Sequence, residues 1–105
     1  MIILSSINHN IETNILKIPH IGWNNCQIKS FDNLFKNLNN EQDFYFCHSY
    51  EVSQVDKGLI LSQTFYGHEI ISSIKKDNIY GVQFHPEKSQ QNGLTILKNF
   101  GEHCG

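Results

Sequence analysis

The alternation of polar and apolar residues along the chain is clearest over residues 44–50. Every second position of this stretch carries a ring, namely Phe44, Phe46, His48 and Tyr50. A period of two is typical of an extended chain whose two sides face different surroundings. The segment is therefore predicted to be a β-strand.

Three further strands are expected in quick succession, over residues 59–66, 69–75 and 79–85. Gly67-His68 supplies a turn before the second of them, and Lys76-Asp77-Asn78 supplies a turn before the third. Strands this close, joined by short turns, predict antiparallel hairpins.

Helical spacing occurs twice. Apolar residues at positions 31, 34, 35 and 38 predict a short helix over 31–38, between a short strand at 26–30 and a polar loop at 39–43. Near the end of the chain, Ser89 is a suitable N-cap and Gly101 a suitable C-terminal stop for a second helix. The apolar stripe of that helix consists of Leu94, Leu97 and Phe100.

The stretch at residues 18–25 lacks either period. Pro19 and Gly22 interrupt it, so an irregular, exposed turn is expected that presents His20 and Trp23 at the surface.

Composition narrows the class of protein. The chain has 105 residues, with 8 lysines and no arginine against 10 acidic residues, giving a net charge of −2. Such a chain suits one domain or part of one, and it is poorly equipped to bind phosphate backbones. It contains neither a long apolar run typical of a membrane span nor the features of a signal peptide. A cytoplasmic protein that binds neither nucleic acid nor membrane is therefore expected.

The three cysteines are far apart and form no Cys-x-x-Cys pair. This usage favours reduced thiols over a disulfide framework. Cys47-His48 and His103-Cys104 are adjacent pairs, but adjacent residues rarely ligate one metal, and no metal site or cofactor is expected.

The most informative stretch lies at residues 80–89. Its apolar face consists of Tyr80, Val82 and Phe84. The intervening positions bring Gln83, His85 and Glu87 to the other side if the chain stays extended through Pro86, which itself restricts His85 to an extended conformation. A carboxylate two residues from an imidazole can orient it as a general base, although a lone His-x-Glu pair at a strand end is also common without catalysis.

Four strings together resemble one family. Residues 81–89, Gly-Val-Gln-Phe-His-Pro-Glu-Lys-Ser, resemble the His/Glu signature of class I, triad-type glutamine amidotransferases. Residues 18–24, Ile-Pro-His-Ile-Gly-Trp-Asn, are similar to a motif of the glutaminase subunit of imidazole glycerol phosphate synthase. Residues 46–50 and 64–67 resemble two further segments of that family, in the same order.

The resemblance implies an α/β fold, namely the C-terminal part of a class I glutamine amidotransferase domain, with mostly antiparallel or mixed strands and a C-terminal helix. His85 is then the general base and Glu87 the carboxylate that fixes its tautomer. The residues implied to line the glutamine pocket are His48, Ser49 and Tyr50. Those implied to face an ammonia-accepting cyclase subunit are Trp23, Asn24 and Lys88. The remaining histidines, with His20 alone considered for the partner interface, are expected at the surface or in hydrogen bonds.

One family element is missing from the sequence. The family carries its nucleophile in a Gly-x-Cys-x-Gly turn, and none of Cys26, Cys47 and Cys104 lies in such a turn. Residues 1–105 are therefore expected to form part of one domain, without the N-terminal half that bears the nucleophile, and to be inactive alone. The expected partners are glutamine, that missing half and the cyclase subunit. Two alternatives stay open: a glutaminase component that feeds a sugar-modifying amidotransferase, and a non-catalytic partner-binding module.

Overall fold

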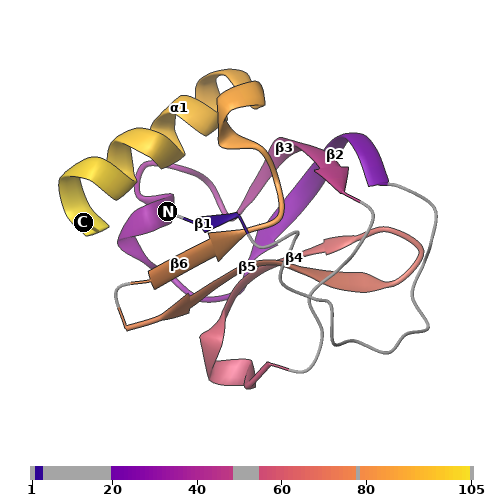
Figure 1. Cartoon of the computed structure of the whole chain (residues 1–105), viewed down its shortest axis with the longest axis horizontal. Coiled ribbons are helices and arrows are strands. Elements are labelled where there is room, and N and C mark those ends of the chain that lie inside the picture. The colour runs from indigo at the N-terminus through magenta and orange to yellow at the C-terminus, as the bar shows by residue number, and fades with distance from the viewer. Residues whose placement is uncertain (1, 4–19, 49–54, 78, 105) are drawn as a thin grey trace.

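The computed structural model describes residues 2–3, 20–48, 55–77 and 79–104 (Figure 1). They form a six-stranded sheet in the order β1-β6-β5-β4-β2-β3, followed by helix α1. The strands are β1 (Ile2–Ile3), β2 (His20–Ile28), β3 (Glu41–His48), β4 (Ile60–Phe65), β5 (Glu69–Lys76) and β6 (Ile79–Val82). Helix α1 spans Gln90–Asn99 and passes into a π-helical turn at Phe100–Cys104. The predicted α/β architecture, with a C-terminal helix, is confirmed.

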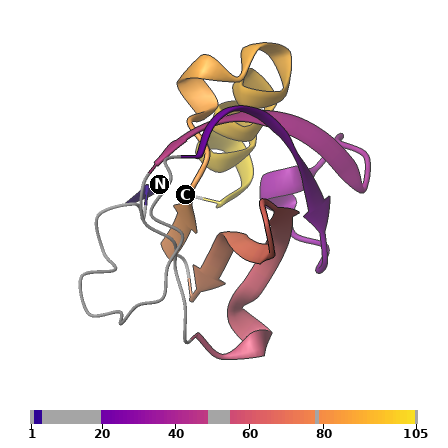
Figure 2. The same cartoon turned by 90° about the vertical axis from the view of Figure 1, so that its right-hand side faces the viewer.

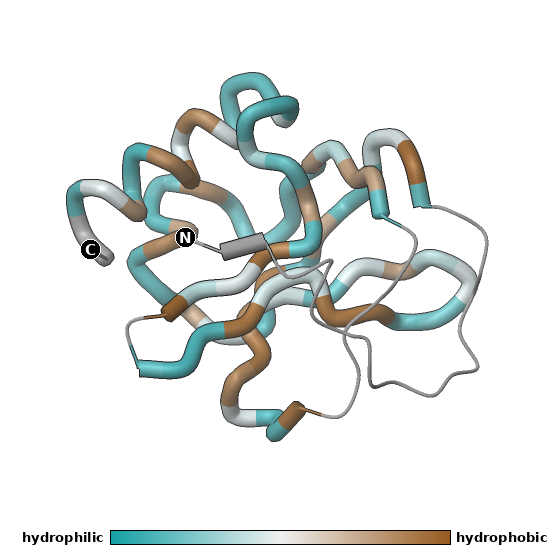
Figure 3. Tube along the Cα trace, viewed as in Figure 1, coloured by the Kyte–Doolittle hydropathy of each residue, from teal (hydrophilic) through white to brown (hydrophobic). Residues whose placement is uncertain are grey.

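All the strand pairs but one are antiparallel within the described residues, the exception being β1 with β6. The predicted hairpins β4–β5 and β5–β6 are present, with Gly67 at a φ of 78° in the turn between the first two. Such a φ favours glycine because it has no Cβ. Figure 3 shows that the end of β5 and the start of α1 are hydrophilic.

The sheet curls so that the segment after β6 meets β3. The chain continues past β6 to Phe84, which forms an isolated antiparallel bridge with Phe46 of β3. Figure 2 shows β2 and β3 as a long curved hairpin across the molecule. The bridge places the segment after β6 alongside β3, although β6 and β3 are separated by three strands in the sheet.

Aromatic side chains fill the space inside the curl. The ring of Phe84 stacks on that of Phe44 with centroids 4.2 Å apart, and it meets Phe46 edge-on at 6.0 Å. All three are fully buried, together with Leu34 and Ile96. Burial of such side chains is the main favourable term in folding. The residues that close the sheet therefore also form its hydrophobic core.

Three local predictions are wrong. Residues 18–25 were expected to form an irregular turn, but residues from His20 onward belong to strand β2, and Gly22 takes a φ of 123° within it. Residues 39–43 were expected to be a loop, but β3 begins at Glu41. The helix expected over 31–38 is reduced to a 3-10 turn at Asn33–Phe35, because the Asp32 side chain caps the amide of Leu34 and the backbone turns away just after it.

Of the apolar stripe predicted for the C-terminal helix, only Phe100 packs against the core, where it is partly buried. Leu94 and Leu97 are exposed, and the buried positions are Gly93, Ile96 and Asn99. The helix also does not stop at Gly101, since the π-helical turn continues through it.

Candidate functional site

The turn that carries His85 and Glu87 is fixed to the edge of β3. The amide of His85 donates a hydrogen bond to the carbonyl oxygen of Tyr45 at 2.8 Å. His85 has a φ of −101° and a ψ of 100°, the extended conformation expected of a residue before proline. The backbone then folds into a 3-10 turn over Pro86–Lys88, so it does not stay extended through Pro86 as predicted.

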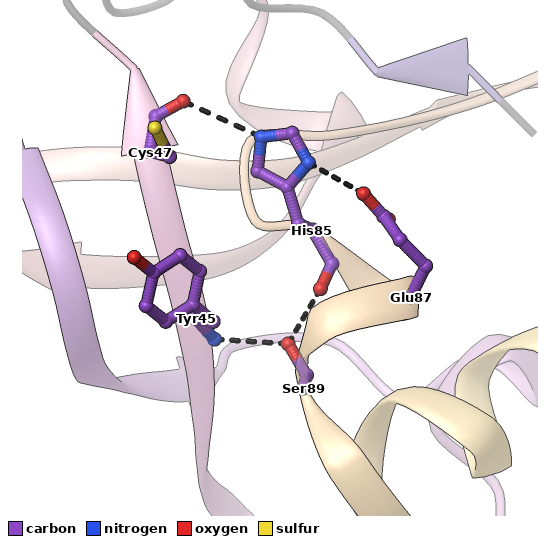
Figure 4. A network of polar contacts seen from close by, with 5 residues as sticks. All are labelled: Tyr45, Cys47, His85, Glu87 and Ser89. Atoms are coloured by element: carbon purple, nitrogen blue, oxygen red, sulfur yellow. Dashed lines mark hydrogen bonds and ion pairs between the residues drawn. The ribbon is translucent and has the colours of Figure 1, made fainter.

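This turn brings the imidazole and the carboxylate together (Figure 4). Nδ1 of His85 lies 2.8 Å from Oε2 of Glu87. Partial burial raises the pKa of Glu87, but the hydrogen bond from His85 and smaller electrostatic contributions outweigh it and lower that pKa below its ordinary value of 4.5. Glu87 is therefore a carboxylate at neutral pH and holds the Nδ1 proton of His85.

The other ring nitrogen faces strand β3. Nε2 of His85 lies 3.4 Å from the carbonyl oxygen of Cys47. When Nδ1 carries the proton of a neutral ring, Nε2 has the lone pair and is the nitrogen that can accept a proton. Once protonated, Nε2 can donate to the Cys47 carbonyl while Nδ1 keeps its bond to Glu87. The site is thus built to take up one proton.

Ser89 ties three elements together at this point. Its hydroxyl accepts a hydrogen bond from the amide of Tyr45 at 2.9 Å and donates to the carbonyl oxygen of His85 at 2.7 Å (Figure 4). Ser89 is at the N-cap position of α1 as predicted, but its side chain makes no capping bond there. The sequence reading missed this link because it depends on a contact between residues 44 positions apart.

His48 lies at the end of β3, and its side chain is on the opposite side of the strand from that of Cys47. It is buried, and its Nε2 lies 3.0 Å from Nδ1 of His20. Its own Nδ1 is 3.5 Å from the amide nitrogen of Gln83. Ser49 and Tyr50, the other two predicted pocket residues, lie outside the described residues.

Trp23 lies on β2 and is 49% exposed. It is paired with Tyr45 across the hairpin, and the two rings meet edge-on with centroids 6.0 Å apart. Lys88 is exposed on the turn after Glu87. The next residue, Ser89, contacts the backbone amide of Tyr45, the residue paired with Trp23.

Asn24 behaves differently from its neighbour. Its side chain is half-buried and donates to the carbonyl oxygen of Phe65 at 2.9 Å, and it lies 3.1 Å from Nε2 of His20. His20 was expected at the surface, in a hydrogen bond or at the interface. The ring is hydrogen-bonded, as its contacts with His48 and Asn24 show, but it is 4% exposed, so the surface position expected from Pro19 and Gly22 is wrong.

The described residues show neither a membrane-crossing helix nor a metal cluster. No described helix has the length and apolar character needed to span a bilayer. Likewise, histidine, cysteine, aspartate and glutamate side chains do not gather in threes within the described ranges. Cys26 is buried beside Thr64, and burial raises the pKa of its thiol to about 11, so it is no ready nucleophile.

Comparisons with known proteins agree with the resemblance. The imidazole glycerol phosphate synthase subunit HisH of Caldanaerobacter subterraneus subsp. tengcongensis is 50% identical over 86 residues, which cover 82% of this chain and 42% of that protein. The subunit HisH 1 of Campylobacter jejuni subsp. jejuni serotype O:23/36 is 48% identical over 85 residues, covering 81% and 42%. The chain spans about two fifths of the length of these curated relatives.

A solved structure shares the fold. It is assigned to a GMP synthase subunit of Thermoplasma acidophilum, and it superposes with a TM-score of 0.65 at 22% sequence identity. The match covers 80% of this chain and 43% of that one. The family model described as glutamine amidotransferase class-I matches residues 5–104. The chain belongs to the class-I glutamine amidotransferase family.

Proposed function

We propose that this chain supplies the general base and its orienting carboxylate to the glutaminase subunit of an imidazole glycerol phosphate synthase, which acts in histidine biosynthesis. The observation that carries the proposal is the 2.8 Å contact between Nδ1 of His85 and Glu87, with Nε2 turned away from the carboxylate. The matches to HisH subunits support the assignment to this synthase.

In the proposed reaction, His85 takes the proton of a cysteine thiol through Nε2, and the thiolate attacks the side-chain carbonyl of glutamine. His85 then gives the proton to the departing ammonia, and water hydrolyses the thioester to glutamate. Glu87 stabilises the imidazolium that forms between these steps. No Gly-x-Cys-x-Gly turn occurs in the 105 residues, so the thiol comes from a segment outside this sequence.

The glutamine pocket is proposed to lie at the end of β3, with His48, Ser49 and Tyr50. The position of His48 one residue after Cys47 supports this, because the Cys47 carbonyl lies beside His85. The substrate amide must reach His85, and the end of β3 is the described strand end next to it.

The surface that meets the cyclase subunit is proposed to include Trp23, Asn24 and Lys88. The exposed indole of Trp23 and the neighbouring exposed Ile21 give this surface an apolar centre. Large exposed aromatic residues beside polar ones are typical of interface anchors. Asn24 contributes by holding the turn after β4 through its bond to Phe65.

The test is complementation in trans. The chain is mixed with a polypeptide that contains the Gly-x-Cys-x-Gly half of a HisH subunit, and glutamate release is measured with and without cyclase. We expect no release from the chain alone and turnover from the mixture. His85→Ala should lower the rate by several orders of magnitude, about the cost of removing a triad base, and Glu87→Gln by less.

The matched control is His68→Ala, which removes an exposed histidine on the turn between β4 and β5. Its rate should stay within about twofold of the unsubstituted mixture, as for most surface substitutions. A mixture that binds cyclase but never releases glutamate would favour the non-catalytic binding module. An active mixture indifferent to His85→Ala would refute the assignment of the base.

A further inference from the structure

His20 is a buried histidine for which the proposed reaction has no use. Its ring is stacked between Phe46, at 4.4 Å and 12°, and Tyr66, at 4.0 Å and 11°. Each of its nitrogens lies near a polar side chain, Nδ1 near His48 and Nε2 near Asn24. Burying a polar ring costs free energy unless each ring nitrogen has a hydrogen-bond partner of the right kind, a donor for the lone pair and an acceptor for the N–H.

The backbone settles that direction through Asn24. Its Oδ1 accepts a hydrogen bond from the amide of Asn25 at 2.7 Å, and its Nδ2 donates to the carbonyl oxygen of Phe65 at 2.9 Å. These two backbone groups fix which end of the amide is nitrogen. Nδ2 is therefore the donor toward Nε2 of His20, 3.1 Å away, and that nitrogen of His20 must carry a lone pair.

The proton of neutral His20 then resides on Nδ1, and it points to His48. Nδ1 of His20 donates to Nε2 of His48 at 3.0 Å, so the proton of neutral His48 resides on its own Nδ1. The side-chain amide of Gln83 lies 3.5 Å from that Nδ1, and this tautomer requires the amide to turn its oxygen, not its nitrogen, toward it. Burial, and next the proximity of His48, lower the pKa of His20 to about 4, so the His20 ring is neutral near pH 7. The chain of donors runs one way, from Asn24 through His20 to His48.

We propose that His20 is a positioning residue for the glutamine pocket, which it serves by fixing the tautomer and the ring position of His48 at the end of β3. The proposal rests on the function proposed above, because the pocket belongs to that function. Ser49 follows His48 directly in sequence. The residue before His48 is Cys47, whose carbonyl lies beside His85. A rotated His48 ring would therefore disturb the strand end from which both the substrate and the base are approached.

Two substitutions separate hydrogen bonding from stacking. His20→Phe keeps an aromatic ring between Phe46 and Tyr66 but cannot donate to His48. His20→Asn keeps an N–H donor near the position of Nδ1 but loses the ring. The matched control is His68→Gln, at an exposed histidine.

Kinetics of the complemented enzyme test the pocket role. Loss of one buried hydrogen bond is worth about 0.5–1.5 kcal/mol, so His20→Phe should raise the KM for glutamine roughly 2- to 12-fold with a smaller change in kcat. His20→Asn should restore KM toward the control while lowering the melting temperature. If KM rises most in the variant with the lower melting temperature, regardless of which variant keeps the N–H donor, the positioning role is overturned.

Ring nitrogens of the 105-residue chain test the tautomers directly. Long-range proton–nitrogen correlation spectra should show protonated Nδ1 and unprotonated Nε2 in both His20 and His48. Asn24→Asp replaces the donor by a carboxylate and should place a proton on Nε2 of His20. The opposite tautomers in the unsubstituted chain would overturn the inference even if the complemented enzyme is active. An inactive mixture with the expected tautomers would instead overturn the proposed function, and with it the pocket role.

Discussion

Helix α1 approaches the turn that carries Glu87 so closely that only glycine fits at position 93. A Cβ placed on Gly93 would lie 1.8 Å from the carbonyl oxygen of Pro86, 2.7 Å from its carbonyl carbon and 2.9 Å from Cβ of Ser89. Contacts under 3.0 Å to backbone atoms cannot be relieved by turning a side chain. Gly93→Ala must therefore push α1 away from the turn.

The sign of the effect depends on two opposing terms. Alanine in place of glycine inside a helix stabilises by about 1 kcal/mol. Overpacking costs about 1–3 kcal/mol, and the shift also strains the hydrogen bond from the Gly93 amide to the carbonyl oxygen of Ser89, 3.2 Å long and worth about 1 kcal/mol. The steric cost outweighs the propensity gain, and we expect Gly93→Ala to lower the free energy of unfolding by roughly 1–3 kcal/mol.

Gly101→Ala is the matched control, because a Cβ at Gly101 meets nothing within 4 Å. Chemical and thermal unfolding of the chain and both variants would measure the difference, at roughly 4–8 °C of melting temperature for each kcal/mol. In the complemented enzyme, Gly93→Ala should also lower kcat, since the turn it displaces holds Glu87. Equal stability of the two variants would refute the close approach of α1 to the turn.

Three further predictions concern single side chains. Ser89→Ala leaves the Tyr45 amide without its acceptor and should lower the free energy of unfolding by about 1–3 kcal/mol, measured with urea. Burial raises the pKa of Asp32, but hydrogen bonds, the largest from Lys75, outweigh it and lower that pKa below 3.8. The carboxylate therefore stabilises the fold at neutral pH, and this stabilisation is lost as pH falls through the folded-state pKa. Asp32→Asn should therefore destabilise the chain near neutral pH and weaken its acid dependence, as urea titrations at several pH values would show. Trp23→Ala should weaken cyclase binding by roughly 1–3 kcal/mol in a titration, with a melting temperature close to that of the unsubstituted enzyme; unchanged affinity with a lower melting temperature would instead place Trp23 in the core.

The strands that the sequence predicted well are those with a regular period and local partners. The described part of the segment 44–50 lies in β3, where the period of two marks the buried side of the strand. The segments at 59–66 and 69–75 correspond to β4 and β5, which are joined by a short turn at Gly67-His68 as predicted. The strand predicted at 26–30 overlaps only the end of β2. The first part of β2 escaped prediction because Gly22 adopts a positive φ inside it and Pro19 precedes it. Both residues are ordinary turn signals, and only pairing with β3 shows that the chain is extended there.

The buried face of α1 was mispredicted for a different reason, namely polar contacts with a distant segment. Asn99 is buried because its amide donates to the carbonyl oxygens of Leu34 and Lys36, over 60 residues away. That contact rotates α1 so that an asparagine faces inward and two leucines, Leu94 and Leu97, face outward. The apolar stripe in the sequence does not predict such a face, because the partner of Asn99 is a turn in a distant part of the chain.

The contact between His85 and Glu87 was predicted, but from the wrong local geometry. The spacing of His85 and Glu87 was read as that of an extended strand, but a 3-10 turn joins them. The closure of the sheet keeps this turn in place. The Phe46–Phe84 bridge places His85 against β3, and the amide of His85 donates to the carbonyl oxygen of Tyr45 in that strand. The bridge that completes the core therefore also positions His85. Substitutions that weaken the core at this bridge are expected to reduce stability and glutaminase activity together, whereas changes on the exposed face of α1 should affect neither in this way.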